Sequence, residues 1–102
     1  MRSVFDLIIK NGNIIDGTGS KPRKSDIGIN GDKIISIGDL KNQEAKTIVD
    51  AKGLCVSPGF IDTHSHADFD ILRDPQHIYV ISQWVTTEIL SPDGIGIVPL
   101  DK

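Results

Sequence analysis

Hydrophobic and polar residues alternate along most of the first 57 positions, which predicts β-strands rather than helices. In residues 4–10, every second residue from Phe5 is apolar, so the apolar side chains share one face of an extended chain. Asn11-Gly12 follows, the residue pair most typical of a two-residue hairpin turn, because both positions tolerate positive φ. Residues 13–16 would then form the returning strand.

Two more hairpins are predicted by the same pattern. The second joins residues 27–29 to residues 33–37 through a turn at Asn30-Gly31-Asp32. The third pairs residues 47–49 with residues 54–56 across a polar turn. The pattern therefore predicts a small sheet built from successive hairpins.

The pattern changes at Pro58-Gly59. Residues 60–64 are typical of a short buried strand, and Asp74-Pro75 then opens a predicted helix, with the aspartate as N-cap and the proline in the first turn. That helix should end near Gln83-Trp84, before a strand rich in β-branched residues at 85–90. Strand, helix and strand in this order predict a parallel pair, as in an α/β sheet or barrel.

Composition excludes several classes of protein. The chain has 102 residues, 25% of them charged, with a formal net charge of −3, so it carries no basic footprint for nucleic acid. No apolar stretch approaches the roughly 18 residues that span a bilayer, and the first residues form no secretory signal. Cys55, the single cysteine, has no partner for an internal disulfide and is interpreted as a small core residue. The expected location is cytoplasmic, without a membrane partner.

The candidate chemistry lies in His64-Ser65-His66, directly after the predicted strand. Residues two apart on an extended backbone point to the same side, so the two imidazoles converge. Each can offer a nitrogen at about 2.0–2.1 Å from a divalent metal. The alternative is a pair of polar loop residues. The preceding glycine turn and apolar strand favour ligands presented at the carboxyl end of a barrel strand.

Residues 58–66, Pro-Gly-Phe-Ile-Asp-Thr-His-Ser-His, resemble the first-strand signature of the amidohydrolase superfamily. Residues 5–12, 16–19 and 29–34 resemble the N-terminal sandwich of that superfamily. Residues 83–89 followed by Asp93-Gly94 narrow the resemblance to the N-acyl-D-amino-acid deacylase branch, also called D-aminoacylases.

The resemblance implies a fold in two parts. Residues 1–57 would be the N-terminal portion of a composite β-sandwich. Residues 58–102 would be the first strand-helix-strand of a TIM-like (β/α)₈ hydrolase barrel, incomplete because such a barrel needs about 250 residues. The fragment itself would be mostly β.

The same resemblance implies a function. The complete enzyme would be a metal-dependent hydrolase, with zinc as the metal, that cleaves the amide of small N-acyl-D-amino acids or related compounds. His64, His66 and Asp93 would be metal ligands, and the catalytic acid would come from later strands. The 102-residue chain alone would therefore be truncated and inactive.

Two departures from the branch pattern bear on Asp93. Trp84 stands where the branch usually has glycine, which would strain the backbone if that position needs positive φ. Ser91-Pro92 replaces a glycine-rich dipeptide, and a proline there would shift the neighbouring carboxylate. The alternative to a ligand is a turn acid before Gly94.

Three other polar residues have paired interpretations. Asp62 could accept a hydrogen bond from a group that orients a metal ligand, or cap backbone N–H groups at the strand end. Asp68 could orient substrate or a ligand, or be a solvated loop acid. His77, in the predicted helix, is expected to face solvent rather than a metal.

Two other functions remain open from the sequence. One is a different amidohydrolase, such as a dihydropyrimidinase or an adenine deaminase. The other is a non-catalytic β-module that binds a metal or a partner. If the barrel strands lack neighbours, their unpaired edges would also favour self-association.

Overall fold

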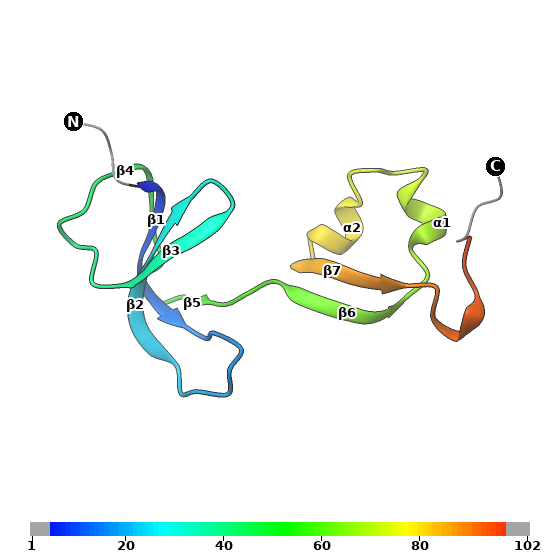
Figure 1. Ribbon diagram of the computed structural model, residues 1–102, viewed down its shortest axis with the longest axis horizontal. Coiled ribbons are helices and arrows are strands. Elements are labelled where there is room, and N and C mark those ends of the chain that lie inside the picture. The colour runs from blue at the N-terminus through cyan, green and yellow to red at the C-terminus, as the bar shows by residue number, and fades with distance from the viewer. Residues whose placement is uncertain (1–4, 98–102) are drawn as a thin grey trace. The chain divides into compact units, whose positions relative to one another are not determined.

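The computed structural model describes residues 5–97 and divides into two compact units between Pro58 and Gly59. Both units contain more strand than helix (Figure 1). Val4 and residues 98–102, which belong to the predicted first strand and second domain, lie outside the described residues. Within residues 5–97, every helix is too short to cross a bilayer.

The first unit is one sheet. β1 (Phe5–Ile14) lies at its centre, and the strand order is β3-β2-β1-β4, with β5 also paired to β1. β2 and β3 are antiparallel to their neighbours, whereas β4 and β5 run parallel to β1. The other strands are β2 (Arg23–Asn30), β3 (Lys33–Gly38), β4 (Ala45–Asp50) and β5 (Cys55–Val56).

The core of the first unit forms around β1. Phe5, Ile8 and Leu40 form a buried cluster, in which Ile8 is fully buried. Gly28 allows the Phe5 ring to lie against the sheet, because an added Cβ would sit 2.7 Å from Phe5 Cδ1. The buried Asp26 carboxylate accepts hydrogen bonds from Leu40 N at 2.9 Å and Asn11 N at 2.8 Å, so its polar atoms are compensated.

The predicted hairpin at Asn11-Gly12 is wrong. Asn11 does have a positive φ of 62°, but the chain continues straight through it as one strand. The register of β1 on β2 shifts between Ile9 and Gly12, which marks a β-bulge. An Asn-Gly pair suits a bulge as well as a turn, since both need positive φ, and the carboxylate of Asp26 accepts the bulged N–H.

Of the other two predicted hairpins, one is confirmed and one is wrong. β2 and β3 pair across Asn30 and Lys33 as expected. β4 and β5 do not pair with each other: β4 lies along the first part of β1, and β5 lies along its last two residues. Alternation shows which residues form strands but not which neighbour each strand selects.

The second unit is a strand-helix-strand segment. β6 (Phe60–Ser65) and β7 (Val85–Leu90) form a parallel pair, as predicted. Helices α1 (Asp68–Ile71) and α2 (Ile78–Ile81) connect them on the same side of the pair (Figure 1). A 3₁₀ turn, Pro92–Gly94, follows β7.

Glycine is required where β6 begins. An added Cβ at Gly59 would overlap the side chain of Thr86 on β7, so the strands can approach closely only with glycine there.

Three details of this second unit differ from prediction. Asp74-Pro75 forms a turn, in which Asp74 O accepts from His77 N at 2.9 Å, and the helix starts only at Ile78. α1 had not been predicted. The strand expected to be buried is exposed, with Phe60 at 60% of its surface, because only β7 pairs with β6 among the described residues.

Candidate metal centre

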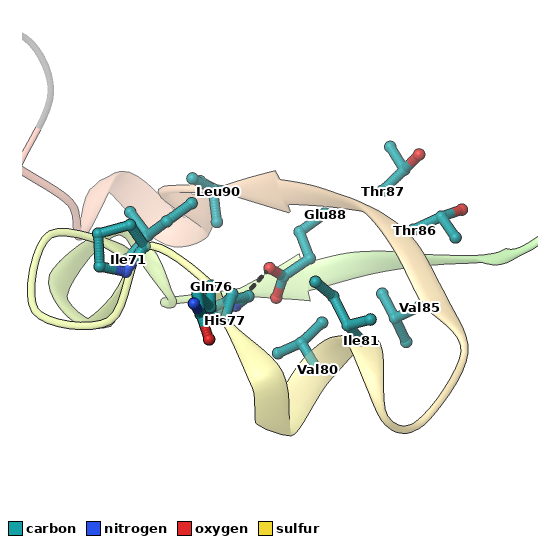
Figure 2. Close-up of a pocket in the computed structure, with 11 residues that line it drawn as sticks. Ile71, Gln76, His77, Val80, Ile81, Val85, Thr86, Thr87, Glu88 and Leu90 are labelled. Carbon is teal, nitrogen blue, oxygen red and sulfur yellow. Dashed lines mark ion pairs between the residues drawn. The ribbon is translucent and has the colours of Figure 1, made fainter. Parts of the chain in front are cut away.

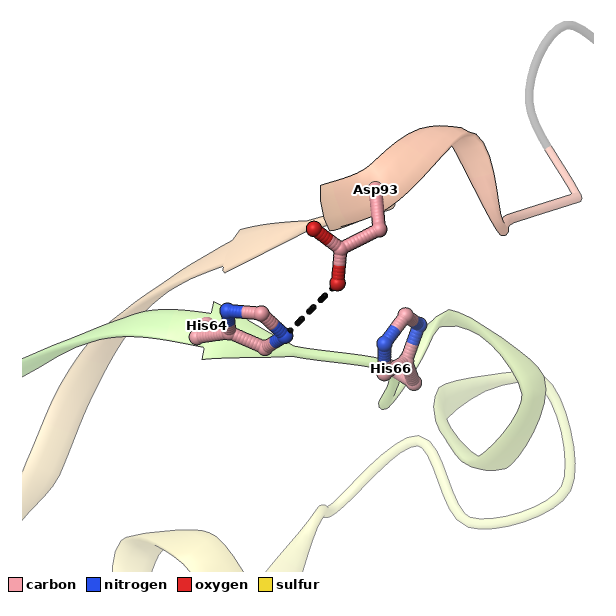
Figure 3. Close-up of side chains that lie close together, drawn as sticks. All are labelled: His64, His66 and Asp93. Carbon is pink, nitrogen blue, oxygen red and sulfur yellow. Dashed lines mark ion pairs between the residues drawn. The ribbon is translucent and has the colours of Figure 1, made fainter.

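His64 and His66 project from the carboxyl end of β6. The strand ends at Ser65, and extended backbone places the histidines on the same side with Ser65 facing the other way. Their ring centroids lie 5.7 Å apart, with an interplanar angle of 75° (Figure 3). The edge-on arrangement leaves nitrogens of both rings directed toward a shared space.

Asp93 completes a cluster of three. Its Oδ2 lies 3.1 Å from His64 Nε2, and one potential ligand atom from each of the three residues lies within 4.8 Å of the others. Among residues 5–97, no second group of His, Cys, Asp or Glu side chains meets this criterion. The structure therefore brings together all three residues that the sequence offered as ligands.

The backbone after β7 explains why Pro92 does not displace Asp93. Pro92 occupies the first turn of the 3₁₀ segment, where its missing N–H is not needed. Ser91 and Asp93 adopt left-handed conformations with φ of 58° and 59°, and Gly94 follows with φ of 72°. This run directs the Asp93 carboxylate back toward β6 (Figure 3).

A contact to the same loop orients His66. Its Nδ1 lies 3.1 Å from the carbonyl oxygen of Ile95. Because a carbonyl can only accept, Nδ1 must carry the proton in this contact, and Nε2 is left with its lone pair. Metal-binding histidines commonly donate their second ring N–H in this way.

The donor set fits a divalent metal such as zinc. Two imidazoles and one carboxylate are ordinary zinc ligands, and three protein ligands with an open position are typical of catalytic sites. Ligands about 2.0–2.1 Å from a tetrahedral ion lie roughly 3.3 Å apart, close to the distance between His64 and Asp93. The side chains of His64 and Asp93 are 63% and 65% exposed, so the cluster is open to solvent.

Asp62 and Asp68 lie outside this cluster. Asp62 Oδ1 accepts a hydrogen bond from His64 N at 3.0 Å. Asp62 therefore caps a backbone N–H at the end of the strand, as the second of its two interpretations expected. Asp68 is only 2% exposed, so the interpretation as a solvated acid is wrong. Its Oδ2 accepts from Ile97 N at 2.8 Å and from Ser91 Oγ at 3.4 Å, which ties down the loop on both sides of Asp93.

Other side-chain interpretations are corrected as well. His77 is not in solvent: its side chain is 14% exposed and pairs with Glu88, a residue that the sequence analysis overlooked. The signal was an acid in a strand otherwise rich in β-branched residues. Cys55 is exposed rather than in the core. Trp84 is 76% exposed and has a φ of 65°, so a non-glycine residue does hold a left-handed conformation there.

Comparison with known proteins agrees with this geometry. No family model matches the chain. D-aminoacylase of Alcaligenes xylosoxydans xylosoxydans is 46% identical over 96 residues, which cover 94% of this chain and 20% of that protein. The crystal structure of N-acyl-D-glutamate deacylase from Bordetella bronchiseptica, complexed with zinc and a phosphonate inhibitor, superimposes with a TM-score of 0.88. It is 38% identical, over 93% of this chain and 20% of that one. By sequence and by fold, this chain is a relative of the N-acyl-D-amino-acid deacylases.

The deacylase resemblance is thereby confirmed, and it is closer than the resemblance to another amidohydrolase. L-hydantoinase (dihydropyrimidinase) from Arthrobacter aurescens superimposes with a TM-score of 0.56 over only 62% of this chain, at 33% identity. The chain spans about a fifth of the length of the deacylases that it matches. Its mostly β structure corresponds to their N-terminal region.

Proposed function

We propose that this chain supplies the first metal ligands of an amidohydrolase that hydrolyses the amide bond of N-acyl-D-amino acids or related compounds. The observation that carries the proposal is the convergence of His64, His66 and Asp93 on one point. The deacylase relatives support the substrate class, and the zinc in the Bordetella structure supports the metal. The parallel β6–β7 pair would be the start of a TIM-like (β/α)₈ barrel.

His64, His66 and Asp93 would hold the metal, with the proton on His66 Nδ1 leaving its Nε2 free. When bound in such a site, zinc polarises a carbonyl and acidifies water. Amide hydrolysis also needs a group that delivers a proton to the leaving amine. No further His, Cys, Asp or Glu of residues 5–97 joins the cluster, so the proton donor would lie on other strands of the complete enzyme.

Zinc titration of the 102-residue chain by isothermal calorimetry tests the ligand assignment. His64→Ala and Asp93→Ala should each lower zinc affinity at least about tenfold, because each removes a direct ligand. Asp70→Ala is the matched control, since it deletes an exposed carboxylate of the same unit outside the cluster. Equal affinities for His64→Ala and the unmodified chain would remove the assignment.

A substrate panel tests the activity separately. With zinc, the 102-residue chain should release no amino acid from N-acetyl-D-amino acids. The complete enzyme should release it in a chelator-sensitive reaction and should prefer these substrates to dihydropyrimidines. Preference for a dihydropyrimidine would favour the dihydropyrimidinase alternative instead.

Two expectations accompany this proposal. The enzyme is expected in the cytoplasm with a small-molecule substrate. The fragment is expected to self-associate through β6 and β7, because the exposed Phe60, Ile61 and Ile89 lie on strands that pair only with each other in the described part.

A further inference from the structure

A partly buried polar pair lies in the second unit, away from the three candidate ligands. His77 Nε2 is 2.8 Å from Glu88 Oε2, and the two side chains are only 14% and 12% exposed. Figure 2 shows Glu88 reaching from β7 toward His77. The hollow around them is lined largely by apolar side chains, including Ile71, Val80, Ile81 and Leu90. Burying such a pair is costly, and apolar residues of similar size would stabilise the fold at least as well.

Ser65 connects this pair to the candidate metal ligands. Glu88 Oε1 accepts a hydrogen bond from Ser65 Oγ at 2.7 Å. Ser65 Oγ in turn accepts from Ala67 N at 3.1 Å. One hydroxyl thus fixes the backbone on both sides of His66 and ties it to β7.

The backbone of His77 is held in place as well. His77 occupies the N-cap of α2 in a left-handed conformation with φ of 49°. Its carbonyl oxygen accepts from Val80 N and Ile81 N, each at 3.1 Å. The helix therefore holds the backbone from which the His77 imidazole projects. Ser65 donates a hydrogen bond to Glu88 Oε1, whereas His77 Nε2 lies close to Glu88 Oε2 without the geometry of a hydrogen bond.

We propose that His77, Glu88 and Ser65 are positioning residues that hold the end of β6 so that His64 and His66 converge on the metal. The inference rests on the proposed function, in which the cluster binds a divalent metal. Strand alternation provides the geometry: Ser65 faces Glu88 while the flanking histidines face Asp93. The carboxylate of Glu88 thus acts from the opposite face of the strand, without touching the metal.

The test compares metal binding by three variants of the 102-residue chain. Ser65→Ala breaks the link and should weaken zinc binding about tenfold, the lower end of the effect of losing an outer-shell partner. Ser65→Thr keeps the hydroxyl and should stay within about threefold of the unmodified chain. Ser82→Ala is the matched control, because it deletes an exposed hydroxyl of the same unit that donates a hydrogen bond to Tyr79 O, far from the candidate ligands in sequence.

Cobalt provides a readout that a loss of stability alone would not move. In Ser65→Ala, the visible absorption of bound Co²⁺ should change in shape at saturation, since the imidazoles are no longer held in one arrangement. If Ser65→Ala does not fold, Glu88→Gln replaces it, because it preserves size and removes the charge facing His77. Glu88→Gln should also weaken zinc binding, and it should change the shape of the cobalt spectrum as Ser65→Ala is expected to do.

Each outcome has a definite meaning. Zinc affinity and a cobalt spectrum unchanged in Ser65→Ala would overturn the positioning role, as would equal losses in Ser65→Ala and Ser65→Thr. If His64→Ala still lowers affinity in either case, the metal site stands. If His64→Ala has no effect, the proposed function itself fails.

Discussion

The two units of this chain bury their apolar residues very differently. In the first, Phe5, Ile8, Ile14 and Ile27 are each at most 6% exposed. In the second, the buried residue of the described part is polar, Asp68, and most of its large apolar side chains are at least 37% exposed. Within residues 5–97, the first unit has five strands in one sheet, whereas the second has two.

The difference shows that secondary structure and burial are determined separately. A parallel strand pair forms from local pattern and one set of ladder bonds, but its faces stay open until other elements cover them. What organises the second unit is therefore mainly polar: the Asp68 contacts, the His77–Glu88 pair and the cluster at His64. The deacylase relatives, about five times as long, have the chain to cover such faces.

The largest expected change in stability comes from truncating an isoleucine in the first unit, and an isoleucine of the second unit provides the comparison. Ile8→Ala should lower the free energy of unfolding by about 3 kcal/mol, since Ile8 is fully buried and truncation leaves a cavity. Ile61→Ala should cost less than about 0.5 kcal/mol, because Ile61 is 62% exposed. Urea unfolding followed by circular dichroism measures both. Self-association through β6 and β7 would bury Ile61, so the two costs are compared at a protein concentration at which the chain is monomeric. Equal costs there would mean that Ile61 is buried within the monomer.

A smaller effect, of opposite sign, is expected at Trp84. Trp84→Gly should raise stability by about 1 kcal/mol, because φ of 65° is strained for a residue with a Cβ and little packing is lost at 76% exposure. Thermal unfolding measures the change. Trp84→Ala keeps the strained backbone and should give no gain, so an equal gain in both variants would exclude relief of φ as the cause.

The smallest effect is expected at the surface of the first unit. Hydrogen bonds from Thr18, and then from Arg23, lower the pKa of Asp16 far below its ordinary value of 3.8. A lowered pKa means that the folded state favours the carboxylate, so the stabilisation is complete above pH 3.8 and disappears as pH falls below it. Carboxyl chemical shifts followed by NMR across this range should show the late titration.

Asp16→Asn should abolish this acid-range dependence and lower stability at neutral pH only slightly, because the ion pair with Arg23 is partly exposed and contributes little. Asp32→Asn, at an exposed turn position, is the control. A dependence that survives Asp16→Asn would place its origin elsewhere.

The sequence predicted local features well where one physical requirement dominated. The bounds of β7 follow from its β-branched run, and the β2–β3 turn follows from Asn30-Gly31. Which strands pair with each other was not predictable. β4 and β5 both pair with β1 and not with each other, and β1 is far from them in the sequence. The Asn11 bulge was mistaken for a turn because both demand the same positive φ.

The candidate site divides in the same way. The convergence of His64 and His66 could be predicted from their spacing, because a strand places alternate residues on one side, but their interpretation as ligands also needed the preceding glycine turn and apolar strand. Asp93 required the resemblance, since its approach depends on the left-handed backbone after β7. The His77–Glu88 pair was missed because its partners come from different elements and no periodic pattern connects them.

The three candidate ligands all come from residues 64–93, and this has a consequence for the order of assembly. The entropy lost in closing a loop grows only with the logarithm of its length, and short segments close fastest. A metal ion captured by His64, His66 and Asp93 would link two neighbouring strands before distant parts of a long chain had met. In the proposed function, the ion would then bring two strands together early in folding.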